Sequence, residues 1–148
     1  MLLVIDNTKE GPSTRSAAVA RYGASKITLS LLLNNKLVQR VFKTGRNVNL
    51  IICLEKLLSG RKISLKDIKY LGVVVGAGRF TATRLAVTFA NTLSFALKIP
   101  VFGLTENFYH DSAGSLLKKA QTAKAGQYVI ASYSGEPRMG GAKQFLNF

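Results

Sequence analysis

The chain has 148 residues, of which 47% are hydrophobic, so it is long enough for one domain with a core and too apolar to be disordered. Its 21 lysines and arginines outnumber 7 aspartates and glutamates and give a net charge of +14. This excess predicts attraction to a polyanion, with nucleic acid first and an acidic protein or a membrane surface behind it. A solubilising surface charge is the alternative.

Cysteine usage and hydropathy predict a cytoplasmic protein. The one cysteine, Cys53, cannot form an internal disulfide and lies in an apolar run, so we expect a buried structural thiol in a reducing compartment. The apolar start at Met1 reaches Asp6 too soon for a signal peptide. No stretch approaches the roughly 18 apolar residues of a membrane helix, and we expect no membrane partner.

Three strands are expected before the first helix. Residues 2–5 are continuously apolar, whereas residues 26–33 alternate between apolar and polar side chains, which is typical of a strand. Asn34 and Asn35 tolerate the positive φ of a tight turn, and residues 37–42 return as the partner strand of a hairpin.

The first helix is predicted over Val48 to Ser59, with Gly60 ending it. Its apolar stripe comprises Leu50, Ile51, Leu54, Leu57 and Leu58. Val48 and Ile52 lie off that stripe, so the apolar face is wider than one sheet contact needs. Ser64 to Asp67 follows as a capping box that opens a single turn.

The second helix is predicted over Phe80 to Leu97, after a buried strand at residues 71–75 and a glycine turn. Two rows of side chains run along it at a spacing of four. The bulky row is Leu85, Phe89, Leu93 and Leu97, and the small row is Ala82, Ala86, Ala90 and Ser94. A small row lets another backbone approach closely. We therefore expect one face to cover the sheet and the other to receive a helix, from this chain or another.

The remainder is predicted to hold a strand at residues 101–103 and a helix that Ser112 caps and that reaches about Ala125. Residues 128–133 could form a last strand, and residues 134–148 form an irregular basic tail. The order of strands and helices predicts a single α/β domain over residues 1–148 with a mixed sheet.

The glycine turn is a candidate anion site. Free N–H groups at a helix start attract anions, and the candidate residues are Gly76, Gly78, Arg79 and Thr81. The pattern is not a dinucleotide fingerprint, because threonine replaces the third glycine, and it matches neither a Walker A loop nor a nucleophile elbow. The alternative is that the glycines only permit the turn.

The segment from Ser64 to Glu106 resembles the TsaB family. That family has an S-L-x-D-I/L lead, then G-x-G-S-F-T-G-x-R, a long small-residue helix and I-P-V-x-G. The matching residues are Ser64, Leu65, Asp67, Ile68, Gly76, Gly78, Phe80, Thr81, Arg84, Ile99, Pro100 and Gly103. The opening strand, which ends at Asp6, resembles that of the actin-like ATPase superfamily, and Tyr133 to Pro137 resembles the tail of shortened members.

This resemblance implies an actin-like (ribonuclease H-like) βββαβαβα domain with one lobe. It also implies a non-catalytic subunit that binds the catalytic paralogue TsaD, with a TsaE-like ATPase, to place a threonylcarbamoyl group on an adenosine of tRNA. Partner contact would use both long helices, through Leu50, Ile51, Leu54, Leu57, Ala82, Ala86, Val87, Ala90, Leu93 and Ser94. The free protein could form a homodimer. ATP and metal are expected in the partner subunits and no cofactor in this chain.

Departures from the family pattern concentrate at the turn. Ala82 replaces a glycine, Ala77 replaces a proline, and Arg79 replaces a serine, which adds a cation there. The chain is also shorter than typical members, which carry a second lobe. An actin-like ATP site between lobes is therefore not expected.

No catalytic constellation is expected. A Ser-His-Asp triad of Ser112, His110 and Asp111 is not expected, because the side chains of residues adjacent in the chain rarely point at one another. One histidine cannot form the metal-binding pair of the catalytic paralogue, and we expect it at the surface. Asp6 is interpreted as a turn or cap residue.

Two alternatives to the scaffold subunit stay open. A stand-alone RNA-binding module fits the charge, with candidate tRNA contacts at Lys118, Lys119, Lys124, Arg138 and Lys143. No known RNA-binding motif supports it. A minimal nucleotide-dependent transferase or peptidase is less favoured, since it needs a second acid or a metal pair.

Overall fold

The computed structural model describes residues 1–7, 25–44, 49–76 and 80–132. Its elements, in chain order, are β1 (Leu2–Asp6), β2 (Ser25–Leu33), β3 (Lys36–Thr44), α1 (Leu50–Ser59), the 3-10 turn η1 (Leu65–Asp67), β4 (Tyr70–Val74), α2 (Phe80–Leu97), β5 (Val101–Leu104), the 3-10 turn η2 (Glu106–His110) and α3 (Ala113–Thr122). The predicted order of strands and helices up to α3 is therefore confirmed, and the predicted bounds of α2 agree with those observed.

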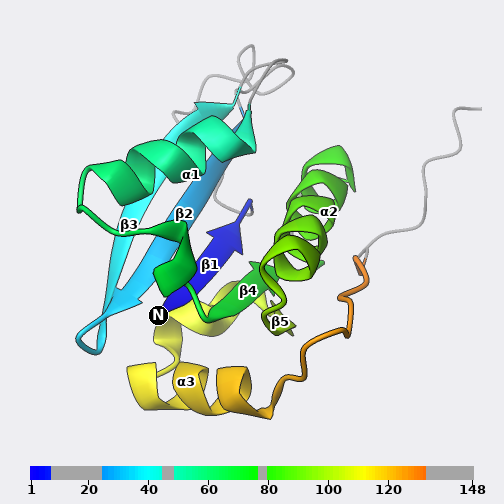
Figure 1. Cartoon of the computed structure of the whole chain (residues 1–148). Helices are drawn as coiled ribbons and strands as arrows, with labels where there is room; N and C mark the ends of the chain where they lie inside the picture. The colour runs from blue at the N-terminus through cyan, green and yellow to red at the C-terminus, as the bar shows by residue number, and fades with distance from the viewer. Residues whose placement is uncertain (8–24, 45–48, 77–79, 133–148) are drawn as a thin grey trace, which may run out of the picture.

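The five strands form one mixed sheet in the order β3-β2-β1-β4-β5. β1, β2 and β3 pair antiparallel, whereas β1 pairs with β4, and β4 with β5, in parallel (Figure 1). The hairpin turn lies at Asn34 and Asn35, whose φ angles of 47° and 61° are those that asparagine tolerates. The α/β class and the mixed sheet that the sequence predicts are both observed.

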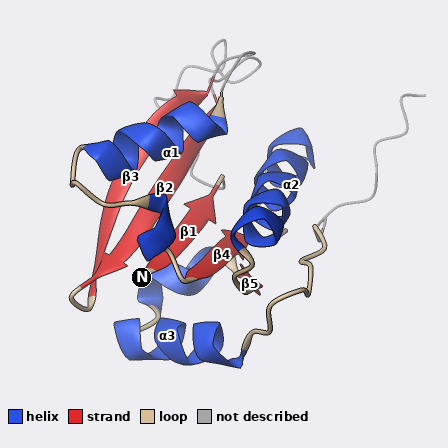
Figure 2. Ribbon diagram, viewed as in Figure 1, coloured by secondary structure: helices blue, strands red, loops and turns tan. Residues whose placement is uncertain are grey.

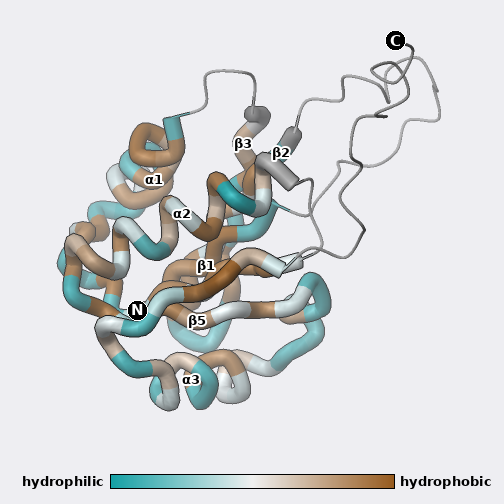
Figure 3. Tube along the Cα trace, turned by 90° about the vertical axis from the view of Figure 1, so that its right-hand side faces the viewer, coloured by the Kyte–Doolittle hydropathy of each residue, from teal (hydrophilic) through white to brown (hydrophobic). Residues whose placement is uncertain are grey.

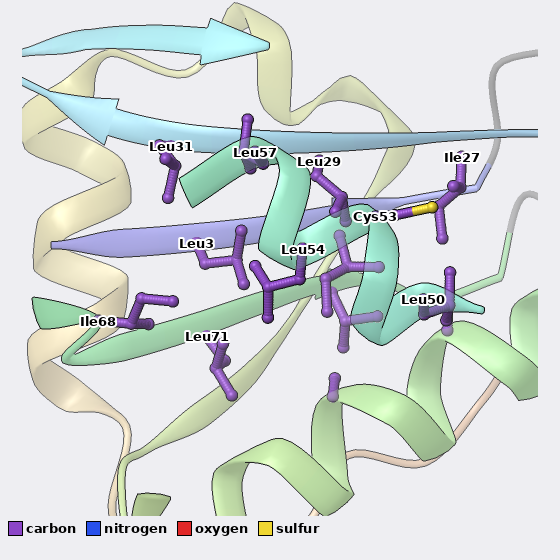
Figure 4. Packing of buried hydrophobic residues seen from close by; sticks show 14 of the residues in the cluster. Leu3, Ile27, Leu29, Leu31, Leu50, Cys53, Leu54, Leu57, Ile68 and Leu71 are labelled. Carbon is purple, nitrogen blue, oxygen red and sulfur yellow. The ribbon is translucent and has the colours of Figure 1, made fainter. Parts of the chain in front are cut away.

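Helices cover both faces of this sheet (Figure 2). Alternate residues of β1 point to opposite sides, so Leu3 and Ile5 pack under α1 and α2, and Leu2 and Val4 pack under α3. Figure 4 shows how α1 lies on the strands through its buried leucines and Cys53. The core thus has two layers, one on each side of the sheet.

The small row of α2 faces the sheet. Ala86 and Ala90 are fully buried and Ser94 is 3% exposed, while Leu85 of the bulky row is 48% exposed. Small side chains here let the helix backbone approach β4 closely. The small row is therefore the face that covers the sheet, and the predicted partner contacts Ala86 and Ala90 pack against the sheet of the same chain instead.

Three further expectations need correction. α1 begins at Leu50, with the Asn49 side chain accepting from the N–H groups of the first turn, and Val48 lies outside the described residues. α3 ends at Thr122, earlier than expected. Residues 128–132 form no strand; the Asn91 amide donates to the Val129 carbonyl and accepts from its N–H, at 2.8 and 3.0 Å.

Gly60 does not provide the left-handed residue that ends α1. Its φ is −62°, and the left-handed residue is Lys62, with φ 54°. Ile63 N donates to Leu58 O and Lys62 N donates to Ser59 O, the two bonds of a Schellman motif. Glycine is the usual residue at that position because a side chain there costs about 1–2 kcal/mol.

Candidate functional site

A shallow groove of about 420 Å³ lies between α1 and α2. Its lining comprises Asn49, Leu50, Ile51, Leu85, Thr88, Phe89 and Thr92. Ile51 is 66% exposed and Leu85 is 48% exposed, and both helices carry hydrophobic residues where they lie side by side (Figure 3). Large apolar side chains exposed together on two neighbouring helices are typical of a protein interaction surface.

The partner contacts predicted from sequence divide into two sets. Ile51 is open to solvent, and Ala82 and Leu93 are half-buried. The buried set is Leu50, Leu54, Leu57, Ala86, Val87, Ala90 and Ser94. These buried side chains fill this chain's own core, so all but Leu50, which still lines the groove, are unavailable to a partner. The large apolar side chains that α2 leaves exposed are Leu85, which lines the groove, and Phe95, which does not.

The glycine turn is described only at its edges. Gly76 has φ 110°, a conformation that glycine alone adopts without strain, and a Cβ there would lie 3.4 Å from the Ser132 carbonyl oxygen. Gly78 and Arg79 lie outside the described residues, as does the side chain of Thr81, which is in the first turn of α2. Their role as anion ligands stays a prediction.

Asp6 anchors the connection after β5 to the end of β1. The Tyr109 hydroxyl, on η2, donates a hydrogen bond to Asp6 Oδ2 at 2.5 Å, and Asp6 is fully buried. Burial raises the pKa of Tyr109 well above its usual value, and the hydrogen bond and the charge of Asp6 raise it further, while the Ser30 hydroxyl opposes the shift. Asp6 thus holds two distant segments together, a role that the sequence interpretation missed.

The structure shows no catalytic triad of Ser112, His110 and Asp111. Ser112 Oγ accepts from Ser115 N and caps α3, as predicted, and Asp111 Oδ2 pairs with Lys119 Nζ at 2.7 Å. His110 is exposed, as predicted. Cys53 is buried, also as predicted, and burial raises the pKa of its thiol, with Lys56 and Arg40 opposing that shift.

Three of the five predicted tRNA contacts fall within the described residues. Lys118 and Lys124 are exposed on and just after α3, and Lys119 is held by Asp111. Arg138 and Lys143 lie outside the described residues. Among the residues that the structure does describe, no group of three or more His, Cys, Asp or Glu side chains is placed to hold a metal ion, and no helix is long and apolar enough to cross a membrane.

Known proteins resemble this chain in sequence and in fold. The family model for TsaD, tRNA N6-adenosine threonylcarbamoyltransferase, matches residues 41–127, which is more than half of the chain. The protein named tRNA threonylcarbamoyladenosine biosynthesis protein TsaB of Buchnera aphidicola subsp. Schizaphis graminum is 34% identical over 97 residues, 62% of this chain and 46% of the relative. Its namesake from Buchnera aphidicola subsp. Acyrthosiphon pisum is 30% identical over 63 residues, 43% of this chain and 28% of the relative.

Solved structures support the fold. YeaZ from Pseudomonas aeruginosa superposes with a TM-score of 0.55 at 20% identity, over 74% of this chain and 48% of that one. A second structure, titled as similar to peptidase YEAZ from the same organism, superposes equally well. The chain therefore spans less than half the length of the relatives that it matches.

These likenesses and the mixed sheet define an α/β domain of the actin-like, ribonuclease H-like class. Within that class, the chain belongs to the TsaB family, in the group that the TsaD family model describes.

Proposed function

We propose that this protein serves in the threonylcarbamoylation of tRNA adenosine as the subunit that binds a TsaD-like catalytic subunit. The names of its relatives support the pathway, since both curated relatives are named for threonylcarbamoyladenosine biosynthesis. The observation that carries the partner role is the apolar groove between α1 and α2, where Ile51 and Leu85 are exposed.

The chemistry of the groove suits a helical partner. Its open side offers aliphatic and aromatic anchors, with threonines between them, and it lacks a charged residue in its lining. The TsaD family model covers the stretch that holds both helices of this chain. A TsaD-like protein would therefore carry a corresponding helix pair, and two such pairs can pack their apolar ridges into one another.

In this proposal the chain contributes binding, and the transfer step belongs to the catalytic subunit, which would bring ATP and metal. A TsaE-like ATPase would join the same assembly. Asp6 supports this division of roles, because its carboxylate is fully buried and holds the Tyr109 hydroxyl.

The test is co-purification with the TsaD-like protein of the same genome, without tRNA and at moderate salt. We expect a stoichiometric complex that Leu85→Glu abolishes, because a carboxylate cannot be buried against apolar anchors without a large cost. Ile130→Glu is the matched control, since Ile130 is 85% exposed and lies outside the groove lining. A complex that survives Leu85→Glu, or no complex with the parent chain, would contradict the proposal.

The oligomeric state of the isolated chain should be compared between the parent and Leu85→Glu, because a groove that fits a paralogous helix pair also fits a second copy of this chain. We expect any homodimer of the free protein to dissociate on Leu85→Glu and to compete with the TsaD-like protein for the groove. A homodimer that forms a mixed complex without dissociating would place the partner surface elsewhere.

A further inference from the structure

Two lysines occupy backbone positions that favour glycine. Lys62 ends α1 with φ 54°, and Lys98 ends α2 with φ 55°. At α2, Ile99 N donates to Ser94 O and Lys98 N donates to Phe95 O, the same pair of bonds that ends α1. Both long helices therefore close with a Schellman motif in which lysine stands where glycine fits best.

Both lysines follow the C-terminal end of a helix that leads into a parallel strand. Lys62 is in the connection that leads from α1 to β4, and Lys98 is in the connection that leads from α2 to β5 (Figure 1). These two strands start side by side, because Leu71 N donates to Pro100 O. Three more cations lie on the connection before β4. We call the five together the basic rim: Arg61, Lys62, Lys66, Lys69 and Lys98.

The backbone of the basic rim is firmly held. The Ser64 side chain and the Asp67 carboxylate cap η1 reciprocally, and Lys69 N donates to Met1 O at 2.8 Å. Arg61 Nη1 donates to the Leu57 carbonyl at 3.4 Å and is half-buried. A fixed backbone lowers the entropy lost when these side chains engage a ligand.

In the described part of the chain, none of the cations of the basic rim forms an ion pair with an acid. The nearest acid along the connection, Asp67, accepts from Ser64 N, and the other acid near this end, Glu55, is on the preceding helix. Within residues 49–76 and 80–132, the ion pair that the structure contains is Lys119 with Asp111, on the opposite face. Lys62, Lys66, Lys69 and Lys98 are all exposed.

We propose that the basic rim binds the phosphate backbone of RNA. This inference rests on the proposed function, which supplies tRNA as the polyanion. A protein partner fits less well, because interfaces rely on aromatic or aliphatic anchors and are depleted in lysine, and the one large apolar side chain exposed on the connection is Leu65, at 37%. Phosphate contacts need only positioned cations.

The left-handed conformation of Lys62 and Lys98 allows both charges to be removed by substitutions that do not destabilise the fold. Lys62→Gly with Lys98→Gly removes two charges and also places glycine at two left-handed positions, so the variant should melt at the same temperature as the parent or higher. The matched control is Lys118→Gln with Lys124→Gln, which removes the same charge from exposed positions on and after α3.

Binding of an unmodified tRNA transcript is measured by fluorescence anisotropy across a salt series. We expect the glycine pair to weaken binding about tenfold and to lower the salt slope by about 1.5, because each lost phosphate contact lowers it by about 0.7–0.9. The glutamine pair should change both quantities less. An equal or larger effect of the glutamine pair, or no tRNA binding by the parent chain, would overturn the inference.

The same variants separate this inference from the proposed function. The glycine pair should keep its complex with the TsaD-like protein, because neither lysine lines the groove. Leu85→Glu should lose that complex and keep tRNA binding. A glycine pair that loses the complex would show that the basic rim meets protein, which contradicts the inference and leaves the partner role intact.

Discussion

The helices and turns on the two faces of the sheet differ in how much apolar surface they leave exposed. On the α3 face, Phe108 is 1% exposed, Leu116 is fully buried, and Tyr109 closes over the Asp6 carboxylate. On the α1/α2 face the inner sides of the helices are buried against the sheet, but their outer sides expose Ile51 and Leu85. Among the described residues, the α3 face buries Phe108 and Leu116 but leaves Val41 at its β3 edge 51% exposed, whereas the outer sides of α1 and α2 carry apolar surface that a partner would cover. Burial in the free chain therefore separates residues that stabilise the fold from residues open to binding.

The largest effect on stability is expected at the α3 face. Phe108→Ala should lower the free energy of unfolding by about 3–5 kcal/mol, because it removes a buried aromatic ring and leaves a cavity. Phe95→Ala is the control, since Phe95 is 72% exposed on α2, and should change it by no more than about 0.5 kcal/mol. Urea unfolding measures both, and equal effects would contradict the distinction between the faces.

Loss of the hydrogen bond between Tyr109 and Asp6 should have the second largest effect on the free energy of unfolding. Tyr109→Phe leaves a buried carboxylate with one donor fewer, at a cost of about 1–3 kcal/mol at neutral pH. The raised pKa adds a pH dependence. The unfolded chain loses the phenol proton near pH 10 while the folded chain retains it. The stabilisation is therefore complete below about pH 10 and is lost as the pH rises above it.

Stability measured from pH 8 to pH 11 tests this dependence. The difference between parent and Tyr109→Phe should shrink above about pH 10. Tyr128→Phe controls for tyrosine titration in general, because Tyr128 is 61% exposed. A difference that stays constant across this range would contradict the buried hydrogen bond.

A smaller effect is expected where α2 holds the segment after α3. Asn91→Ala removes both hydrogen bonds to Val129 and should cost about 1–2 kcal/mol. Hydrogen exchange should rise in residues 127–132 and stay unchanged in α1. Thr92→Ala is the control on the next residue, whose hydroxyl bonds only to its own helix at Thr88 O. Unchanged exchange in Asn91→Ala would contradict this tether.

The smallest expected effect is an increase in the free energy of unfolding. Lys62→Gly should raise the free energy of unfolding by about 0.5 kcal/mol, because relief of the left-handed strain exceeds the extra entropy of the unfolded glycine. Lys62→Ala removes the same charge and keeps the strain, so it should bring no gain. Thermal unfolding of both variants checks this, and an equal gain for alanine would attribute the effect to charge.

The sequence predicted the elements better than the surfaces. The apolar run of β4 reflects burial, and Pro100 and the capping at Ser112 reflect local backbone chemistry, so each is readable from neighbouring residues. The alternation along β2 identified a strand, but it did not show that Thr28 and Ser30 on its other face are also fully buried. The spacing of Ala86 and Ala90 showed only that some backbone approaches α2 closely. It could not show whether that backbone is the sheet or another helix, and the structure shows the sheet.

The remaining misses depend on contacts between distant segments. Tyr109 and Asp6 are 103 positions apart, and Asn91 and Val129 are 38 apart, so no local pattern marks either pair. The predicted end of α1 at Gly60 agrees with its C-cap, but the left-handed residue is Lys62, two positions further on, and it was missed because glycine is the residue that the cap rule selects. Local rules identify the residue types of a cap more reliably than its position.

Hydrogen–deuterium exchange of the chain, alone and with the TsaD-like protein, tests the central claim most directly. Complex formation should protect the outer positions of α1 and α2 around Ile51, Leu85 and Phe89, and should leave η2 and α3 unchanged. Protection confined to η2 and α3, with none along α1 and α2, would contradict the account, because the face that carries the groove would then not be the one that binds.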